Sequence, residues 1–276
     1  MQSARAAAAF FLLLAVAVAP AGALAQGNCA KPVYLSFDTG HMGVAPLVAD
    51  VLRRQDVRVT FFAAAERTQT GGDSLDSQWA PWWKARAAEG HEFASHTYDH
   101  AYWRGDIKGI APRFRIQPSS GAFAGRQFTW DAEQYCADIV KASDRLQHIT
   151  GKKPLPLFRA PGGKTSPKLL AAAKACGYEH VGWSPAGFLG DELPSEKFSN
   201  EKLLQQALDG IRPGDILVAH LASGRARIHG RRRCWNLDRR AQGQRLLLQD
   251  AAPASGLSCL DRIAFLNRVV LCRWTG

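Results

Sequence analysis

The chain has 276 residues, of which 46% are hydrophobic and 21% charged, a composition typical of one large folded domain rather than a disordered or fibrous protein. Its formal net charge of +11 would suggest an anionic partner, but residues 222–276 contain 11 Arg, three Asp and no Lys or Glu. Eight of the eleven net positive charges therefore lie in this C-terminal segment, and we expect no nucleic-acid partner.

The N-terminal residues are typical of an export signal. A positive charge at Arg5 precedes an apolar run over residues 6–19, and Ala23 and Ala25 are the small residues expected before a cleavage site. We therefore predict a signal peptide over residues 1–25 and an exported protein, either periplasmic or extracellular. The run is too short to span a bilayer and no later stretch is long enough, so no membrane span is expected. Six cysteines in an exported chain permit disulfides without fixing their connectivity.

Short apolar runs alternate with segments of helical periodicity from residue 33 onward. Strands are predicted over residues 33–37, 57–62 and 91–95, and helices over residues 46–54 and 79–88. Residues 102–128 contain Gly and Pro without a clear period, so a long irregular loop is predicted there.

The second half continues the alternation. Thr129 is predicted to cap a helix that runs to Ile149, and Ser166 with Pro167 begins another helix that stops at Gly177. A further helix is predicted over residues 199–208, and strands over residues 155–158, 181–183 and 215–220. Repeated βα units predict an α/β fold with a parallel sheet: a (β/α) barrel, with an open doubly wound sheet as the alternative.

Five short motifs lie at or just after predicted strands: SFDTG (residues 36–40), SHTYDH (95–100), FRAPGG (158–163), GW (182–183) and LVAH (217–220). The carboxyl ends of parallel strands meet at one edge of the sheet, which is where barrel active sites are built. His96 and His100 are four residues apart, a spacing that would place both imidazoles on one face of a helical turn and suit a shared cation.

In this order, the five motifs resemble those of the NodB-homology polysaccharide deacetylases (carbohydrate esterase family 4), over residues 31–221. The resemblance implies a distorted (β/α) barrel within a domain of residues 26–221. It also implies that Asp38 is the general base acting on a metal-bound water, that Arg159 pairs with Asp38, and that His220 is the general acid. His96 and His100 would bind the divalent metal, for which zinc is expected.

The resemblance further implies a substrate groove and an activity. Pro161 and Gly162 would shape a loop close to the substrate, Trp183 would line the groove, and Tyr98 is an aromatic side chain available to stack on a sugar ring. The implied function is that of a secreted hydrolase that removes N-acetyl groups from a polysaccharide substrate. The alternatives are a catalytically impaired glycan-binding relative and a metal-independent hydrolase of small amides with the same fold.

Two positions depart from the family pattern. Relatives usually have a second aspartate where this chain has Thr39, and that aspartate completes a two-histidine, one-carboxylate metal site. Threonine supplies no charge, so we expect weaker metal binding, with water or Asp38 taking the position or the site remaining empty; His41 and Asp99 are nearby alternatives that the spacing does not select. The aspartate that often follows the tryptophan in relatives is also missing from the residues directly after Trp183.

The composition changes abruptly after Leu221, where arginine replaces lysine, glutamate disappears and no clear period remains. We predict that residues 222–276 are a frame-shifted reading, or else a disordered basic extension. In the first case the barrel would lack its last βα unit.

Overall fold

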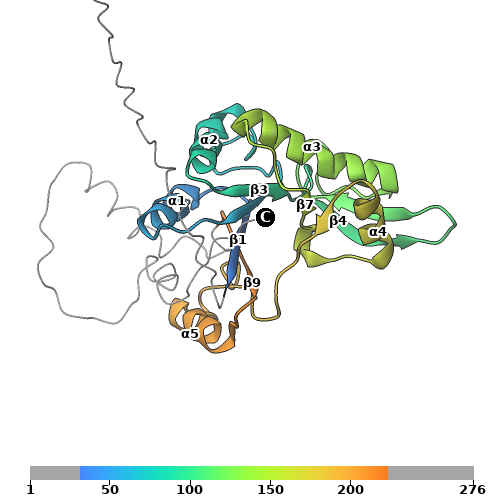
Figure 1. The fold of residues 1–276 in the computed structure, drawn as a ribbon. Coiled ribbons are helices and arrows are strands. Elements are labelled where there is room, and N and C mark those ends of the chain that lie inside the picture. Colours follow the sequence, from blue (N-terminus) through green and yellow to red (C-terminus); the bar gives the residue numbers. More distant parts are fainter. Residues whose placement is uncertain (1–31, 223–276) are drawn as a thin grey trace, which may run out of the picture. The chain divides into compact units, whose positions relative to one another are not determined.

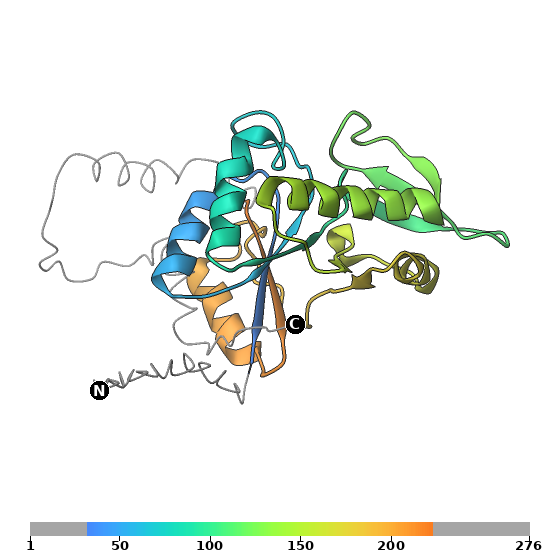
Figure 2. The ribbon, with the colours of Figure 1, turned by 45° about the horizontal axis from the view of Figure 1, so that its top comes forward.

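The computed structural model describes residues 32–222, and Figures 1 and 2 show their arrangement. The strands are β1 (Tyr34–Asp38), β2 (Thr60–Ala63), β3 (Glu92–Ser95), β4 (Ala101–Ile107), β5 (Arg113–Pro118), β6 (Phe128–Asp131), β7 (Leu157–Phe158), β8 (Glu179–His180) and β9 (Ile216–His220). The helices are α1 (Ala45–Arg54), α2 (Ala80–Ala88), α3 (Ala132–Thr150), α4 (Pro167–Ala175) and α5 (Asn200–Gly210), with short 3-10 turns η1 (Ser77–Trp79) and η2 (Pro161–Gly163). The predicted signal peptide and nearly all of the basic tail lie outside the described residues.

The main sheet has six parallel strands in the order β8-β7-β3-β2-β1-β9. β1 lies between β2 and β9, so that Phe37 is paired in register with both Phe61 and Ala219. These central strands are buried and apolar, as expected where helices cover a parallel sheet. Figure 2 shows α1, α2 and α5 along one side of them.

An irregular segment after β8 brings the chain to β9. The Ser184 N–H donates to the carbonyl of Ile216 at 3.0 Å, and the Leu189 N–H donates to the carbonyl of Val218 at 3.2 Å. The parallel sheet therefore curls into a half-barrel whose strand ends converge. This confirms the predicted barrel type of α/β fold over the open doubly wound alternative.

The prediction of a long irregular loop over residues 102–128 is wrong. This region forms most of a second sheet, with antiparallel strands in the order β4-β5-β6, which projects away from the parallel strands in Figure 1. In β5, Phe114 and Ile116 are buried while Arg113 and Arg115 are exposed, the alternation of a half-buried strand. The intervening Gly and Pro residues obscured this short period in the sequence.

Two other predictions need correction, and the structure adds a disulfide. Helix α3 is capped by Asp131 rather than Thr129, because the Asp131 carboxylate accepts from the Gln134 N–H in a capping box. The strand predicted over residues 181–183 is instead β8 at Glu179–His180. A disulfide between Cys136 and Cys176 joins α3 to the end of α4.

Within residues 32–222, no helix combines the length and apolar character needed to cross a membrane.

Candidate active site

A buried ion pair lies at the carboxyl ends of the parallel strands. Asp38, the last residue of β1, is 2% exposed, and Arg159, which follows β7, is 0% exposed. The Arg159 Nη1 donates to the Asp38 Oδ1 at 2.6 Å, and its Nη2 donates to the Ser36 Oγ at 2.8 Å. Strands β1 and β7 are not neighbours, so it is the curl of the sheet that brings these side chains together.

Further contacts hold the guanidinium in this position. Arg159 also donates to the carbonyls of Val181 and Gly182. The centroid of the Phe62 ring lies 4.0 Å from the Cζ atom of Arg159. Burial raises the pKa of the Asp38 carboxyl, but the charges of Arg159 and His220 and the hydrogen bond from Arg159 oppose that effect, and the pKa lies below its ordinary value. Asp38 is therefore an ionised carboxylate at neutral pH.

His96 and His100 lie on the turn that follows β3. The turn is not helical, because Thr97 and His100 have φ values of 59° and 47°. The two imidazole centroids are nevertheless 4.8 Å apart. The two rings therefore lie together as predicted from their spacing. A turn with left-handed residues, and not a helix face, brings them together.

Each imidazole is oriented through its Nδ1 atom. His96 Nδ1 lies 2.9 Å from the carbonyl oxygen of Arg159, and His100 Nδ1 is hydrogen-bonded to the Ser119 hydroxyl. Burial lowers the pKa of His96 to about 4, although the Asp38 charge opposes this, so the ring is neutral at neutral pH. A neutral His96 that donates from Nδ1 presents the Nε2 lone pair, which lies 3.6 Å from the Asp38 Oδ2.

The turn is held from behind by a carboxylate on α3. The Asp138 carboxylate accepts from the Asp99 N–H at 3.2 Å, and the Asp138 carbonyl accepts from the Tyr98 N–H at 2.9 Å. Burial, together with the charge of Asp99, raises the pKa of Asp138 to about 7. Nothing in the sequence pattern of α3 distinguished this residue from an ordinary helical aspartate.

His220, the last residue of β9, has a carboxylate partner that the sequence interpretation missed. Asp191 accepts from the His220 N–H at 2.7 Å, and its second oxygen lies 3.3 Å from the His220 Nδ1. Burial lowers the pKa of His220, but the hydrogen bond and charge of Asp191, with the charges of Asp38 and Glu192, outweigh it and raise the pKa to about 9. Asp191 stands later in the loop after Trp183 than expected, and the acidic pair of residues 191–192 was the signal available.

Thr39 is buried beside the ion pair and uses its hydroxyl fully. The Thr39 Oγ1 donates to the Glu66 Oε2 at 2.7 Å and accepts from the Ala64 N–H at 3.0 Å. Glu66 follows β2, the strand next to β1, and was not singled out in the sequence. The buried Thr39 is therefore hydrogen-bonded to a carboxylate that lies in the loop after β2.

The residues expected to contact substrate fall into two groups. Gly162 and Gly163, just after Pro161, have positive φ, and a Cβ on either would meet the ring of Tyr102 or Trp183 at 3.0 and 2.6 Å. Glycine is required there for the loop to pack against these rings. Trp183 is half-buried, and its ring centroid lies 5.9 Å from the Arg159 Cζ.

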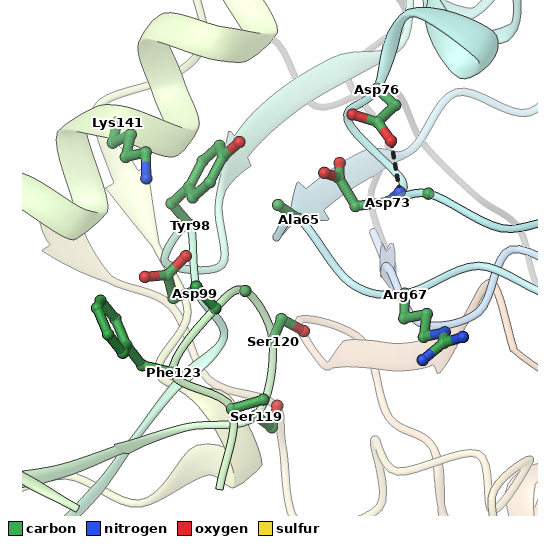
Figure 3. Close-up of a pocket in the computed structure, with 14 residues that line it drawn as sticks. Ala65, Arg67, Asp73, Asp76, Tyr98, Asp99, Ser119, Ser120, Phe123 and Lys141 are labelled. Atoms are coloured by element: carbon green, nitrogen blue, oxygen red, sulfur yellow. Dashed lines mark hydrogen bonds between the residues drawn. The ribbon is translucent and has the colours of Figure 1, made fainter. Parts of the chain in front are cut away.

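Tyr98 forms the second group, because it lines a pocket of about 520 Å³. Figure 3 shows Tyr98 and Asp99 in this pocket, near Lys141 and Phe123. The Lys141 Nζ lies 3.8 Å from the centroid of the Tyr98 ring. Ser119, the hydrogen-bond partner of His100, also lines the pocket, so the pocket adjoins the histidine turn.

The donor set fits a divalent cation in part. The Nδ1 atoms of the two imidazoles are held by the Arg159 carbonyl and the Ser119 hydroxyl, and hydrogen bonds of this kind orient metal-binding histidines. Yet no three His, Cys, Asp or Glu side chains within residues 32–222 are grouped closely enough to hold an ion. The described residues therefore provide two imidazoles but no third side chain placed to bind the same ion.

Comparison with known proteins places this arrangement in a family. The polysaccharide deacetylase family matches residues 25–181. The chitooligosaccharide deacetylase of Azorhizobium caulinodans is 28% identical over 189 residues, which cover 68% of this chain and 72% of that protein. The peptidoglycan-N-acetylmuramic acid deacetylase of Bacillus subtilis is 26% identical over 197 residues, which cover 70% of this chain but only 61% of that longer protein.

Solved structures agree on the fold. A family 4 acetyl xylan esterase from Clostridium thermocellum, in complex with a cobalt ion, superposes with a TM-score of 0.51 at 19% identity. The superposition covers 77% of this chain and 85% of that one, and it shows a common fold. The chain belongs to the polysaccharide deacetylase family.

Proposed function

We propose that this protein is an exported hydrolase that removes acetyl groups from the amino sugars of a polysaccharide. The observation that carries the proposal is that Asp38 and His220 are register partners at the ends of the paired strands β1 and β9, where the pKa shifts leave Asp38 ionised and His220 protonated at neutral pH. A base and an acid whose pKa values are moved apart are what hydrolysis of an amide needs. The related chitooligosaccharide and peptidoglycan deacetylases support an N-acetylated glycan as the substrate class.

Each side chain has one task in the proposed reaction. Asp38 accepts a proton from the attacking water, whose oxygen forms a bond to the acetyl carbon. His220 donates a proton to the sugar nitrogen as the carbon–nitrogen bond breaks, so that acetate and a free amine are the products. Arg159 keeps the Asp38 carboxylate ionised and directed, and Asp191 does the same for the protonated His220.

His96 and His100 would hold a divalent cation, for which we propose zinc. Such a cation would polarise the acetyl carbonyl and lower the pKa of water. His96 meets the requirement for a ligand because it is neutral and its Nδ1 is already occupied. The imidazole of His100 is fixed in the same way by Ser119.

The Cys136–Cys176 disulfide supports the proposed export, because disulfides persist mainly in oxidising compartments. This support for export is independent of the predicted signal peptide, which lies outside the described residues. Export would bring the protein to periplasmic or extracellular glycans.

Acetate release tests the proposal. The purified protein is incubated with N-acetylglucosamine oligomers and, separately, with peptidoglycan, before and after chelation and after zinc is added back. Acetate released from either glycan, lost on chelation and regained with zinc, is the expected result. Glycan binding without acetate release would indicate the catalytically impaired relative, which the replacement of the usual aspartate by Thr39 favours. Turnover of small amides in chelator would contradict the proposed metal role.

A further inference from the structure

The antiparallel sheet has one buried face and one exposed face, and the exposed face is basic. In β5, Phe114 and Ile116 are buried, and Arg113 and Arg115, which alternate with them, are exposed. Arg104 lies at the bulge of β4, the neighbouring strand, and is also exposed. Arg104, Arg113 and Arg115 are together called the arginine face.

Two of these arginines are held in place on the exposed face. The Arg104 Nε donates to the Gln117 Oε1 at 2.9 Å, and its Cζ lies 4.7 Å from the centroid of the Tyr102 ring. Arg115 lies across β4, since a Cβ on Gly105 would come within 2.7 Å of the Arg115 Nη2. The terminal nitrogens of Arg104 make no hydrogen bond within residues 32–222. An oriented guanidinium with free donors loses little side-chain freedom when it binds an anion.

No carboxylate neutralises the arginine face. Within residues 32–222, no ion pair joins any of its three residues to an Asp or Glu. Asp131 is the cross-strand partner of Arg113, but its carboxylate accepts from the Gln134 N–H as the cap of α3. The Asp106 carboxylate accepts from the hydroxyl of Ser166, the N-cap of α4. The positive charge of the arginine face is therefore available to an anionic ligand.

The arginine face begins at the candidate active site. The Tyr102 ring, against which Arg104 lies, is 4.9 Å from the His100 ring. From Tyr102, β4 runs outward to Ile107 over about 16 Å at the usual rise of a strand, and Figure 1 shows this sheet projecting from the parallel strands. A polysaccharide with an acetylated sugar beside the histidine turn can therefore carry its neighbouring sugars along this face.

We propose that the arginine face binds carboxylate groups on the sugars that flank the acetylated residue, so that the preferred substrate is an acidic N-acetylated polysaccharide. A planar guanidinium binds a carboxylate through two parallel hydrogen bonds. Nucleic acids also attract arginine, but the contact of Arg104 with Tyr102, and of Tyr102 with His100, favours the polymer that occupies the active site. This inference rests on the proposed function, because it places the acetylated sugar beside His100.

The affinity of the full chain for two probes tests the inference without any measurement of activity. One probe is a hyaluronan oligosaccharide, in which N-acetylglucosamine alternates with the carboxylate sugar glucuronate, and the other is the uncharged chitohexaose. In the variant R104Q/R113Q/R115Q, affinity for hyaluronan is expected to fall at least about tenfold, the combined size of three exposed charge contacts, while affinity for chitohexaose stays within about twofold.

The matched control is R54Q/K84Q/K202Q, which removes three exposed positive charges from α1, α2 and α5. It is expected to bind both probes as the wild type does, and circular dichroism checks that both variants are folded. An equal loss of hyaluronan affinity in the control, or a wild type that does not bind hyaluronan, would overturn the inference. Wild-type affinity for single-stranded DNA equal to that for hyaluronan would indicate a nonspecific polyanion surface and would overturn it as well.

Steady-state kinetics on hyaluronan connect the arginine face to the active site. R104Q/R113Q/R115Q is expected to raise KM and to leave kcat unchanged, because the three arginines bind sugars beside the reacting one. An unchanged KM would overturn the inference. Absence of acetate release from either glycan by the wild type would contradict the proposed function, while hyaluronan binding that still depends on the three arginines would keep the arginine face as an acidic-glycan site.

Discussion

The Arg159 guanidinium and the Asp38 carboxylate form an ion pair of 2.6 Å at the centre of the site, with both side chains buried. Arg159 has three further acceptors, namely the Ser36 hydroxyl and the carbonyls of Val181 and Gly182. A guanidinium with this many partners is held rigidly, and it holds the carboxylate in turn. The pair links β1 to β7 across two intervening strands, so the contact that joins these strands also orients the proposed catalytic base.

Asp38→Asn is expected to lower turnover by about 10²–10⁴-fold, because an amide accepts no proton from the attacking water. The amide oxygen can still accept from Arg159, so the folded structure should persist. Acetate release and circular dichroism measure the two properties. Ser36→Ala is the control, since it removes one Arg159 contact and leaves the carboxylate. Turnover of Asp38→Asn equal to that of Ser36→Ala would remove Asp38 from the reaction.

Asp191→Asn is expected to narrow the active pH range from its alkaline side. A general acid works only while protonated, and activity that depends on His220 is lost as the pH rises through its pKa of about 9. Removing the Asp191 charge lowers that pKa, so the alkaline limb of the kcat/KM profile moves to lower pH. Glu192→Gln should move it less, since Glu192 is half-exposed and 3.7 Å away. Superimposable alkaline limbs for wild type and Asp191→Asn would contradict the pairing.

Asp138→Asn should remove part of the dependence of stability on pH. Burial and the charge of Asp99 raise the pKa of Asp138 from an ordinary 3.8 to about 7 in the folded state. The folded state therefore binds this proton more tightly, and the resulting stabilisation is present below about pH 4 and lost as the pH rises through about 7. Urea unfolding at about pH 5 and about pH 8 measures the difference in unfolding free energy, which should be smaller in the variant. An equal difference in both proteins would show that Asp138 does not titrate in this range.

Cys176→Ala is expected to lower the unfolding free energy by about 2–4 kcal/mol, because the disulfide to Cys136 closes a long loop in the unfolded chain. The separation of the two cysteines is 40 residues. Wild-type protein treated with a reductant should show the same loss, while the variant should be insensitive to it. Equal urea midpoints for oxidised and reduced wild type would mean that the bond does not form.

The frame shift predicted for residues 222–276 is tested on the gene. Resequencing the codons for His220 to Asp250 is expected to show an added or missing base relative to the printed reading. The corrected reading should contain lysine and supply the last βα unit of the barrel. An intact single frame that encodes the printed arginine-rich tail would contradict the prediction.

The sequence by itself determined which residues would meet at the sheet edge. Asp38, His96, Arg159 and His220 each end or follow a predicted strand, and parallel strands carry their carboxyl ends to one edge regardless of loop detail. The apolar runs of those strands were clear because both faces are buried. The second sheet was missed because its strands have one exposed face and are interrupted by Gly and Pro.

Only the tertiary structure decided the partners that come from loops. Asp191 meets His220, and Glu66 meets Thr39, across 29 and 27 residues of chain. Neither loop has a period that reports where its side chains point, since that direction depends on how the chain crosses neighbouring strands. The direction of the Tyr98 side chain was likewise hidden from the sequence. Thr97 before it has a left-handed backbone, and the Tyr98 N–H is hydrogen-bonded to α3. This turn geometry, which residue spacing does not report, places Tyr98 at the adjoining pocket.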